Sequence, residues 1–559
     1  MVSDRAAFPL TKIVQRAGQF PRFAALILGA LAACGFRPLA LWPLTILAVT
    51  LLIELIARAP SGRRVFALGW CFGLGHFTVG NNWIATAFMY QANMPAWLGM
   101  VAVVLVALYL AVYPALAALG AWALVRPDRT PDRRNVARPV PYLALILALA
   151  ATWTVTEWLR AWVFTGFAWN PIGIALLGPF DSRGLALLTP WLGTYGLSAV
   201  LVLIAGLPGL LVRLARDAKG LGRLLWALPG IAVAAAVIVL MSVPDPWARG
   251  SGLSDGAVRF TLVQPDLRQE IIDDPRYFEA NFVKLARLSI PADPGERRVV
   301  FWPESGLGDY LRDGYPSYLY RLYTYAGDPV LARQRIGRVV GPYGLLMTGA
   351  VDLVIQKEQE VAARNSVTMI DGRGSILAGY SKAHLVPYGE YLALRWLLEP
   401  LGATRLVPGA LDFWPGPGPR TYDLGAYGKA GPQICYEIIF SGEVVDPANR
   451  PDYIFNPFND GWFGTWGSPQ ALAQARLRAI EEGLPVLRST TTGFSAVIDA
   501  DGLVRAFVPF HQAGRIDGRI PPPHEPTLFA RYGNALPLSF AALLALGAFS
   551  VIALGRRRG

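Results

Sequence analysis

The stretch Gly431-Pro-Gln-Ile-Cys-Tyr-Glu-Ile-Ile-Phe440 places a cysteine where an apolar run enters a turn. Cys435 is the only cysteine of a long polar block, because the other two in the chain, Cys34 and Cys71, lie in strongly apolar sequence. Most free cysteines are small buried hydrophobes, so inert packing is the first alternative. A role as nucleophile would require a nearby base to remove the thiol proton and a cation to stabilise the thiolate.

Two stretches upstream of this cysteine supply such groups. Glu304 lies in Phe301-Trp-Pro-Glu-Ser305, and Lys382 lies in Gly379-Tyr-Ser-Lys-Ala-His-Leu-Val-Pro-Tyr-Gly-Glu390. We interpret both as strand-end motifs, and strand ends of a layered α/β domain converge on one crevice. We therefore expect Glu304 to be the base and Cys435 the nucleophile. Lys382 and the backbone N–H just after the cysteine would stabilise an oxyanion.

Two alternatives remain open for these residues. Glu304 and Lys382 would form an ordinary ion pair if the thiol were inert. His384 lies two residues from Lys382 and would share its face of an extended segment. A cysteine–histidine pair is therefore conceivable, although packing is the favoured role for this histidine.

The composition indicates a membrane protein. The chain has 559 residues, of which 53% are hydrophobic and 16% charged, which is too apolar for an ordinary soluble protein. The net charge of +12 comes mostly from basic residues beside apolar runs, where they orient a membrane protein. Nucleic-acid binding is disfavoured for that reason, and three cysteines provide no disulfide framework.

Apolar runs of suitable length predict about eight membrane spans. Gly35-Phe-Arg-Pro38 divides the first run into two short spans. The runs cover approximately residues 23–56, 65–82, 97–125, 140–160, 190–212, 224–243 and 533–554.

Charge in the loops predicts the orientation of these spans. Basic segments alternate with loops nearly free of Lys and Arg, such as Asn81 to Ala96, so the basic set is expected to be cytoplasmic. The sequence therefore predicts membrane helices in residues 1–243, an extracytoplasmic domain in 244–531, and a last span with a basic tail in 532–559. The basic segments are residues 1–22, 58–64, 126–138, 213–223 and 556–558.

Short β-rich runs alternate with helix-like segments such as Gln470-Glu482 within the polar block. This alternation predicts a layered α/β domain. The runs are Val258-Val263, Val299-Trp302, Gly344-Gly349, Val367-Ile370, Pro432-Cys435, Tyr453-Asn456, Pro485-Ser489 and Ser495-Ile498.

Glu, Lys and Cys in this order, within W-P-E, K-x-H-L-V-P-x-G-E and C-Y-E contexts, resemble the nitrilase superfamily. With apolar spans on both sides, the chain resembles its membrane-bound branch, the apolipoprotein N-acyltransferases. Further matches are Glu157-Trp-Leu-Arg-Ala-Trp-Val-Phe-Thr-Gly166, Asn459-Asp-Gly-Trp-Phe-Gly464, Arg476-Leu-Arg-Ala-Ile-Glu481 and Arg488-Ser-Thr490.

This resemblance implies an αββα nitrilase-like domain outside a bacterial inner membrane, in the periplasm. It implies Glu304 as base, Lys382 as oxyanion stabiliser and Cys435 as nucleophile, and it needs no metal or other cofactor. Three neighbouring residues, Glu390, Tyr436 and Glu437, would support them.

The implied reaction moves a fatty acyl group from the sn-1 position of a phospholipid to the N-terminal amine of a diacylglyceryl-cysteine apolipoprotein. It proceeds through a thioester on the cysteine, and the enzyme is expected to be a monomer. The alternative function is a membrane-tethered amidase that hydrolyses a small C–N bond. One departure concerns Ile271-Ile-Asp-Asp274. Members of the family carry a tryptophan in this segment and this chain has none, so the resemblance implies no substrate gating by such a tryptophan here.

The stretch Tyr391-Leu-Ala-Leu-Arg-Trp-Leu-Leu-Glu-Pro400 is unusually apolar for an exposed domain. We expect an arm that dips into the membrane interface, with Trp396, Leu397 and Leu398 as lipid contacts. Burial of these three side chains inside the domain is the equal alternative. The outer loop Asn81 to Trp97 would line the lipid entry, or its aromatic residues would serve as interface anchors.

Overall fold

The computed structural model describes residues 19–90, 95–125, 139–218, 221–246, 253–401 and 411–557. The chain divides into two compact units. The helical unit comprises Met1–Asn82, Met100–Pro244 and Asn534–Gly559, and the α/β unit comprises Trp83–Gly99 and Asp245–Gly533.

Apolar helices that approach one another closely build the helical unit. A Cβ atom at Gly75 would lie 2.0 Å from the carbonyl oxygen of Leu26, so only glycine permits this approach of α2 and α4. The described helices are α2 (Pro21–Ala33), α3 (Trp42–Arg58), α4 (Gly62–Gly80), α6 (Leu98–Leu110), α7 (Val112–Val125), α8 (Pro139–Trp162), α9 (Thr189–Asp217), α10 (Leu221–Ser242) and α18 (Ala535–Arg557).

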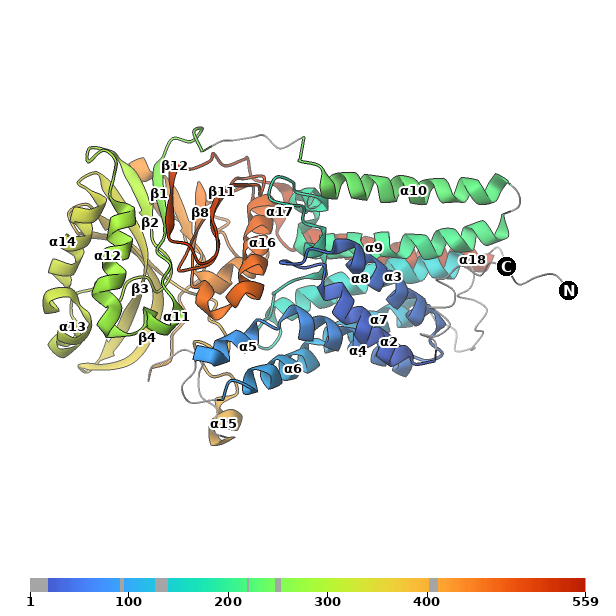
Figure 1. Ribbon diagram of the computed structural model, residues 1–559. Coiled ribbons are helices and arrows are strands. Elements are labelled where there is room, and N and C mark those ends of the chain that lie inside the picture. Colours follow the sequence, from blue (N-terminus) through green and yellow to red (C-terminus); the bar gives the residue numbers. More distant parts are fainter. Residues whose placement is uncertain are drawn as a thin grey trace. The chain divides into compact units, whose positions relative to one another are not determined.

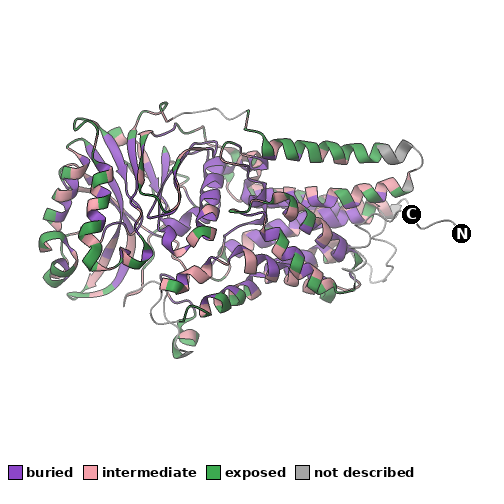
Figure 2. Ribbon diagram, in the orientation of Figure 1, coloured by how far each residue is buried: buried purple, intermediate pink, exposed green. Residues whose placement is uncertain are grey.

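Five helical stretches among the described residues are long and apolar enough to cross a membrane. Figure 2 shows that α10 is exposed along most of its described length, and its exposed side chains include Leu225, Trp226 and Ile231. Such a surface suits hydrocarbon rather than water. The five stretches are Leu98–Val125, Pro139–Trp162, Leu185–Arg216, Leu225–Ser242 and Ala535–Gly555.

The predicted number of about eight spans stays a prediction. α2 is apolar but shorter than these five stretches, and α2 and α3 flank the turn at Gly35-Phe-Arg-Pro38. The basic segments 1–18 and 126–138, together with Lys219 and the tail residue Arg558, lie outside the described residues. The orientation inferred from these charges therefore also remains a prediction.

The α/β unit contains two six-stranded sheets. The first has the order β12-β1-β2-β3-β4-β5, and the second has the order β11-β10-β9-β8-β7-β6. The first sheet is formed by β1 (Arg259–Gln264), β2 (Arg298–Phe301), β3 (Gly344–Gln356), β4 (Gln359–Asp371), β5 (Ile376–Ser381) and β12 (Gly514–Arg519). The second is formed by β6 (Tyr422–Asp423), β7 (Lys429–Pro432), β8 (Tyr453–Phe458), β9 (Val486–Thr490), β10 (Ser495–Ile498) and β11 (Val504–Val508).

The two sheets pack face to face between layers of helices (Figure 1). The ring centroids of Phe301 and Phe455 lie 4.9 Å apart across the sheets, and the Ser489 hydroxyl donates to the Val263 carbonyl at 2.7 Å. Helices α12 (Phe278–Ser289) and α14 (Pro329–Val340) cover the first sheet, and α16 (Gly464–Glu482) covers the second. The predicted αββα architecture is confirmed.

Seven of the eight predicted β-runs lie on strands. The run Pro432-Cys435 shares only Pro432 with β7, which begins at Lys429, and β5, β6, β11 and β12 were not predicted. β1, β2 and β3 run parallel, as do β7, β8 and β9. β4 pairs antiparallel with both β3 and β5, so β5 runs in the same direction as β3. Segments that leave β2, β5 and β7 therefore emerge at carboxyl ends, where sites of layered α/β domains form.

The segment Trp83–Gly99 follows α4 in the chain yet groups with the α/β unit. It contains α5 (Ile84–Ala87) and the 3-10 turn η1 (Phe88–Tyr90). The Trp83 ring lies 4.7 Å from the Phe463 ring, and Tyr90 meets the edge of Trp462 at 6.1 Å. Part of the predicted outer loop thus packs against the turn that precedes α16.

Replacing Trp83 by alanine should destabilise the α/β unit, because this side chain is only 9% exposed. Truncation of a buried tryptophan costs about 3 kcal/mol. We expect a lower midpoint of thermal unfolding for the full chain in detergent, monitored by fluorescence. The matched control is Trp97→Ala, since Trp97 lies in the same segment and is 65% exposed. Equal midpoints for the two variants would contradict the packing role.

Candidate active site

The three predicted reactive residues follow strands of the two sheets. Glu304 comes three residues after β2, Lys382 directly follows β5, and Cys435 comes three residues after β7. Their side chains are buried, with exposed fractions of 5%, 1% and 4%. The sequence placed the cysteine at the end of a strand, whereas it opens the 3-10 turn η9 (Cys435–Ile439).

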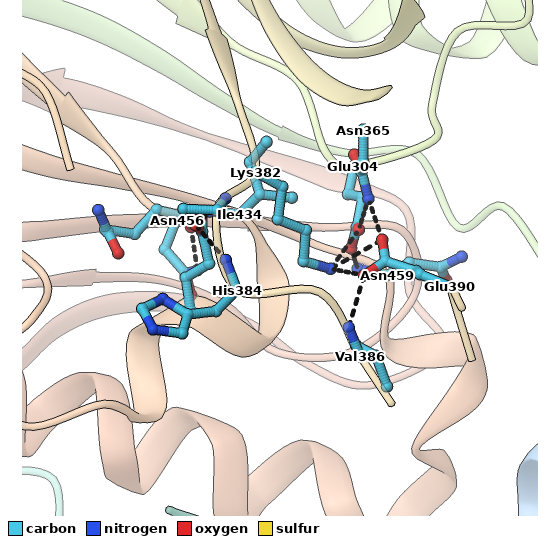
Figure 3. A network of polar contacts seen from close by, with 12 residues as sticks. Glu304, Asn365, Lys382, His384, Val386, Glu390, Ile434, Asn456 and Asn459 are labelled. Atoms are coloured by element: carbon cyan, nitrogen blue, oxygen red, sulfur yellow. Dashed lines mark hydrogen bonds and ion pairs between the residues drawn. The ribbon is translucent and has the colours of Figure 1, made fainter. Parts of the chain in front are cut away.

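Lys382 joins two carboxylates in this buried site (Figure 3). Its Nζ lies 3.0 Å from the Glu390 carboxylate and 3.7 Å from Glu304 Oε1. Burial opposes the charge on the amine, but Glu390 and then Glu304 outweigh it and raise the pKa of Lys382. The residue is therefore a permanent cation at neutral pH.

Two asparagines hold the Glu304 carboxylate. Asn365 Nδ2 donates to Glu304 Oε1 at 2.7 Å, and the backbone N–H of Asn459 donates to Oε2 at 2.9 Å. Asn365 also donates to Glu390 at 2.9 Å (Figure 3). Sequence reasoning missed both roles. Asn459 directly follows β8, and this strand-end position could have indicated a site residue. Asn365 lies inside β4, where no local pattern distinguishes it from a structural residue.

Cys435 has a backbone φ of +51°. This value lies in the left-handed region, which residues other than glycine adopt only under strain. Burial, together with the charge and hydrogen bond of Glu304, raises the pKa of its thiol well above the ordinary value, while Lys382 opposes the shift. The resting residue is therefore a neutral thiol beside a carboxylate that can accept its proton.

Glu437 connects the segment that carries Lys382 to the turn that carries Cys435. Its carboxylate accepts from the Tyr380 hydroxyl and from the backbone N–H groups of Ala383 and Ile434, each at 2.7 Å. Burial raises the pKa of Glu437, and these donors oppose the rise. Its neighbour Tyr436 is buried and meets the edge of the Phe440 ring at 5.3 Å.

His384 makes contacts that fit packing better than base catalysis. Its Nε2 lies 3.0 Å from Glu443, and its ring stacks on Phe440 with centroids 4.3 Å apart. Among the described residues, no group of three or more His, Cys, Asp or Glu side chains could hold a metal ion.

The chemical groups of the site are the thiol of Cys435, the carboxylates of Glu304 and Glu390, the ammonium of Lys382, and amide donors.

The apolar stretch after Glu390 forms a short exposed helix, α15 (Arg395–Leu398). Trp396 is 76% exposed and Leu397 is 44% exposed, whereas Leu398 is half-buried. Figure 1 shows α15 projecting away from the sheets of the α/β unit. The first two side chains therefore lie outside the domain core.

Comparisons with known proteins find similar proteins for both the helical unit and the α/β unit. Residues 28–207 match the family model described as the apolipoprotein N-acyltransferase N-terminal domain, and residues 262–522 match the carbon-nitrogen hydrolase model. Apolipoprotein N-acyltransferases from Rhodopseudomonas palustris and Bradyrhizobium diazoefficiens are each 34% identical to the chain. Those matches cover 93% of this chain and 93% and 94% of the two relatives.

A solved structure of a mutant amidase from Nesterenkonia sp. AN1 is 18% identical to the chain, with a TM-score of 0.33. It covers 51% of this chain and 93% of its own.

The reactivity of Cys435 toward iodoacetamide should depend steeply on pH. Because the pKa of the thiol is raised, we expect alkylation to accelerate about tenfold per pH unit from pH 7 upward, without a plateau below pH 9. Limited access slows the reaction equally at every pH, so the slope is the informative quantity. Peptide mass spectrometry would separate Cys435 from Cys34 and Cys71.

Lys382→Met provides the control for this profile. Lys382 is the cation that lowers the pKa of the thiol, so its loss should move the alkylation curve to still higher pH. A wild-type plateau near pH 7 would mean that the resting enzyme already holds a thiolate, contrary to the structure.

Proposed function

The chain belongs to the apolipoprotein N-acyltransferase family, and on this premise we propose that it moves a phospholipid acyl chain to the N-terminal amine of a diacylglyceryl-cysteine lipoprotein through a thioester on Cys435. The observation that carries the proposed mechanism is the buried cluster that combines a base, a cation and a neutral thiol. These are the groups that thiol-based acyl transfer requires.

In the first half-reaction, Glu304 accepts the thiol proton as sulfur attacks the sn-1 ester carbonyl. The oxyanion that forms is stabilised by Lys382 and by the backbone N–H of Tyr436. When the carbon–oxygen bond breaks, Glu304 returns the proton to the departing lysophospholipid oxygen. The acyl group then remains on sulfur, and each group of the cluster has its starting charge.

In the second half-reaction, the lipoprotein amine attacks the thioester carbonyl. Glu304 takes a proton from the attacking nitrogen, and Lys382 again faces the oxyanion. The carbon–sulfur bond breaks, the amide forms, and the proton held by Glu304 restores the thiol. Glu390 and Glu437 support the cycle, because the first binds Lys382 and the second fixes the two segments that carry Lys382 and Cys435.

The chain is a membrane protein, and a membrane location suits this chemistry. Transfer of a sixteen-carbon chain into water costs on the order of 10 kcal/mol at about 0.8 kcal/mol per CH₂. The thiol must therefore meet its donor at the lipid surface. We place this surface at the outer leaflet of the bacterial inner membrane, as the loop charges predict. The exposed residues of α15 are candidates for entering it.

An amidase that hydrolyses a small C–N bond is the less supported alternative. The carbon-nitrogen hydrolase model covers residues 262–522, but residues 28–207 match a domain described for apolipoprotein N-acyltransferases. An amidase would let water resolve the acyl enzyme. The two functions therefore differ in which nucleophile discharges Cys435.

Acyl-labelled phospholipid should leave a hydroxylamine-sensitive label on Cys435 of the purified protein. A diacylglyceryl peptide should discharge this label at least about a hundredfold faster than water does. Cys435→Ser should lose the label and reduce kcat by about 10³ or more, because an alkoxide is much harder to form at neutral pH. Cys71→Ser is the control, and it should keep both the label on Cys435 and the wild-type kcat. Discharge by water alone would favour the hydrolase.

Changing Trp396, Leu397 and Leu398 together to serine should raise the apparent KM for phospholipid in mixed micelles more than tenfold. Roughly 100 Å² of inserted apolar surface is worth about 2.5 kcal/mol at 25 cal/mol per Å². Because α15 lies outside the domain core, the thermal midpoint should not change. Leu322→Ser is the control, since Leu322 is 63% exposed on a different helix, α13 (Ser317–Tyr323). An unchanged KM in the triple variant would remove the lipid role.

A further inference from the structure

Arg488 is a fully buried cation that the mechanism above does not use. It lies in β9, in the middle of the second sheet, with an exposed fraction of 0%. Its direct neighbour on the parallel strand β8 is Asn456. A buried guanidinium must satisfy its charge and its donors within the protein, so its partners reveal what it holds.

One branch of contacts leads from Arg488 to the nucleophile. Its Nη1 donates to Asn456 Oδ1 at 2.7 Å, and Asn456 Nδ2 donates to the Gln433 carbonyl at 2.6 Å. Gln433 is two residues before Cys435, whose φ of +51° persists only if the surrounding structure enforces it. This branch anchors the chain at the point where it enters the strained turn.

A second branch leads from Arg488 to the base. Its Nη2 lies 3.1 Å from Asp460 Oδ1, and Asp460 opens the 3-10 turn η10 (Asp460–Trp462). The preceding residue, Asn459, donates its backbone N–H to Glu304 Oε2 at 2.9 Å. The position of that donor therefore depends on a turn that Arg488 holds.

The surroundings of Arg488 exclude water and fix its plane. The guanidinium carbon lies 3.9 Å from the centre of the Phe458 ring, and Phe458 contacts Phe463 at 4.9 Å between centroids. Asp460 is also 0% exposed, and burial disfavours the charge of both partners. Apolar replacements of buried ion pairs are often equally stable, so stability alone gives little reason for a charged pair here.

We propose that Arg488 is a positioning residue for acyl transfer, which sets the base Glu304 and the nucleophile Cys435 relative to each other through Asp460 and Asn456. The inference rests on the proposed function. Glu304 follows β2 and Cys435 follows β7. The side chain of Arg488 is linked to both, to Glu304 through Asp460 and to Cys435 through Asn456. A lysine has a single point of attachment and would not reproduce both branches of the fork.

The test compares the rate constant of thioester formation with its amplitude in a single turnover. A variant that merely folds less well has fewer active molecules, so its amplitude falls while its rate constant stays. Misplacement of reacting groups lowers the rate constant itself, by up to about a hundredfold for 1 Å. For Arg488→Lys we expect a 30-fold to 100-fold lower rate constant and an unchanged KM for phospholipid.

Arg298→Gln is the matched control. Arg298 is a buried arginine of the first sheet, where it binds the Thr261 hydroxyl and the Ser289 carbonyl. This variant should lower the thermal midpoint and the amplitude but keep the wild-type rate constant. If Arg488→Lys behaved in the same way, the positioning role would be wrong and Arg488 would be a structural residue only.

Single-branch variants keep the proposal testable if Arg488→Lys does not fold. Asn456→Ala interrupts the path to Cys435, and Asp460→Asn weakens the path to Glu304. Each should lower the rate constant by about threefold to tenfold, and each should add little to Arg488→Lys, because they act through the same side chain. Rate constants equal to wild type in both variants would overturn the proposal.

The experiment is run with two acyl donors, labelled phospholipid and p-nitrophenyl butyrate. The butyrate burst reports attack by Cys435 on an ester without requiring a lipid substrate. If phospholipid gave no thioester with the wild type, the proposed function would fail, and the burst rate constants would still decide the role of Arg488. If both donors acylated all variants at the wild-type rate, only the positioning role would fail.

Discussion

The structure of the site follows from one constraint, which is that a site without water can accept little additional charge. Glu304 and Glu390 share a single ammonium, Lys382, and all three side chains are buried. A permanent thiolate beside them would be a further buried negative charge, and burial, followed by the charge of Glu304, raises the pKa of Cys435. Moving the proton from sulfur to Glu304 adds no charge to the cluster. On the proposed mechanism, activation of the thiol is therefore coupled to proton transfer to Glu304 within the site.

The sheets make this arrangement possible because each of the three reactive groups follows a separate strand. Glu304 leaves β2, Lys382 leaves β5 and Cys435 leaves the turn after β7, so no local segment contains the site. Backbone donors and buried side chains then fix the arrangement. Glu437 binds the segments of Lys382 and Cys435, and Asn459 binds Glu304. Mutual positioning of such groups is what converts ordinary side chains into catalysts.

The sequence could predict the elements of this site that are encoded locally. The alternation of strand-like runs with helix-like segments indicated the layered fold, and the motifs around Glu304, Lys382 and Cys435 indicated that these residues converge, although β5 before Lys382 was not predicted. The sequence could not predict Asn365, which lies inside β4 and acts only through a distant partner. The left-handed backbone of Cys435 and the packing of Trp83 on Phe463 also depend on tertiary contacts. Local patterns carry no information about such contacts.

Burial of the sulfur also bears on which nucleophile completes the reaction. An acyl group on Cys435 would lie where the residue itself is only 4% exposed, so water competes poorly for it. A lipid-anchored amine approaches from the same phase as the acyl chain and need not cross water. On the proposed function, a site that excludes water and receives lipid substrates favours aminolysis over hydrolysis. On the proposed function, the burial that raises the pKa of the thiol would also protect the thioester formed on it.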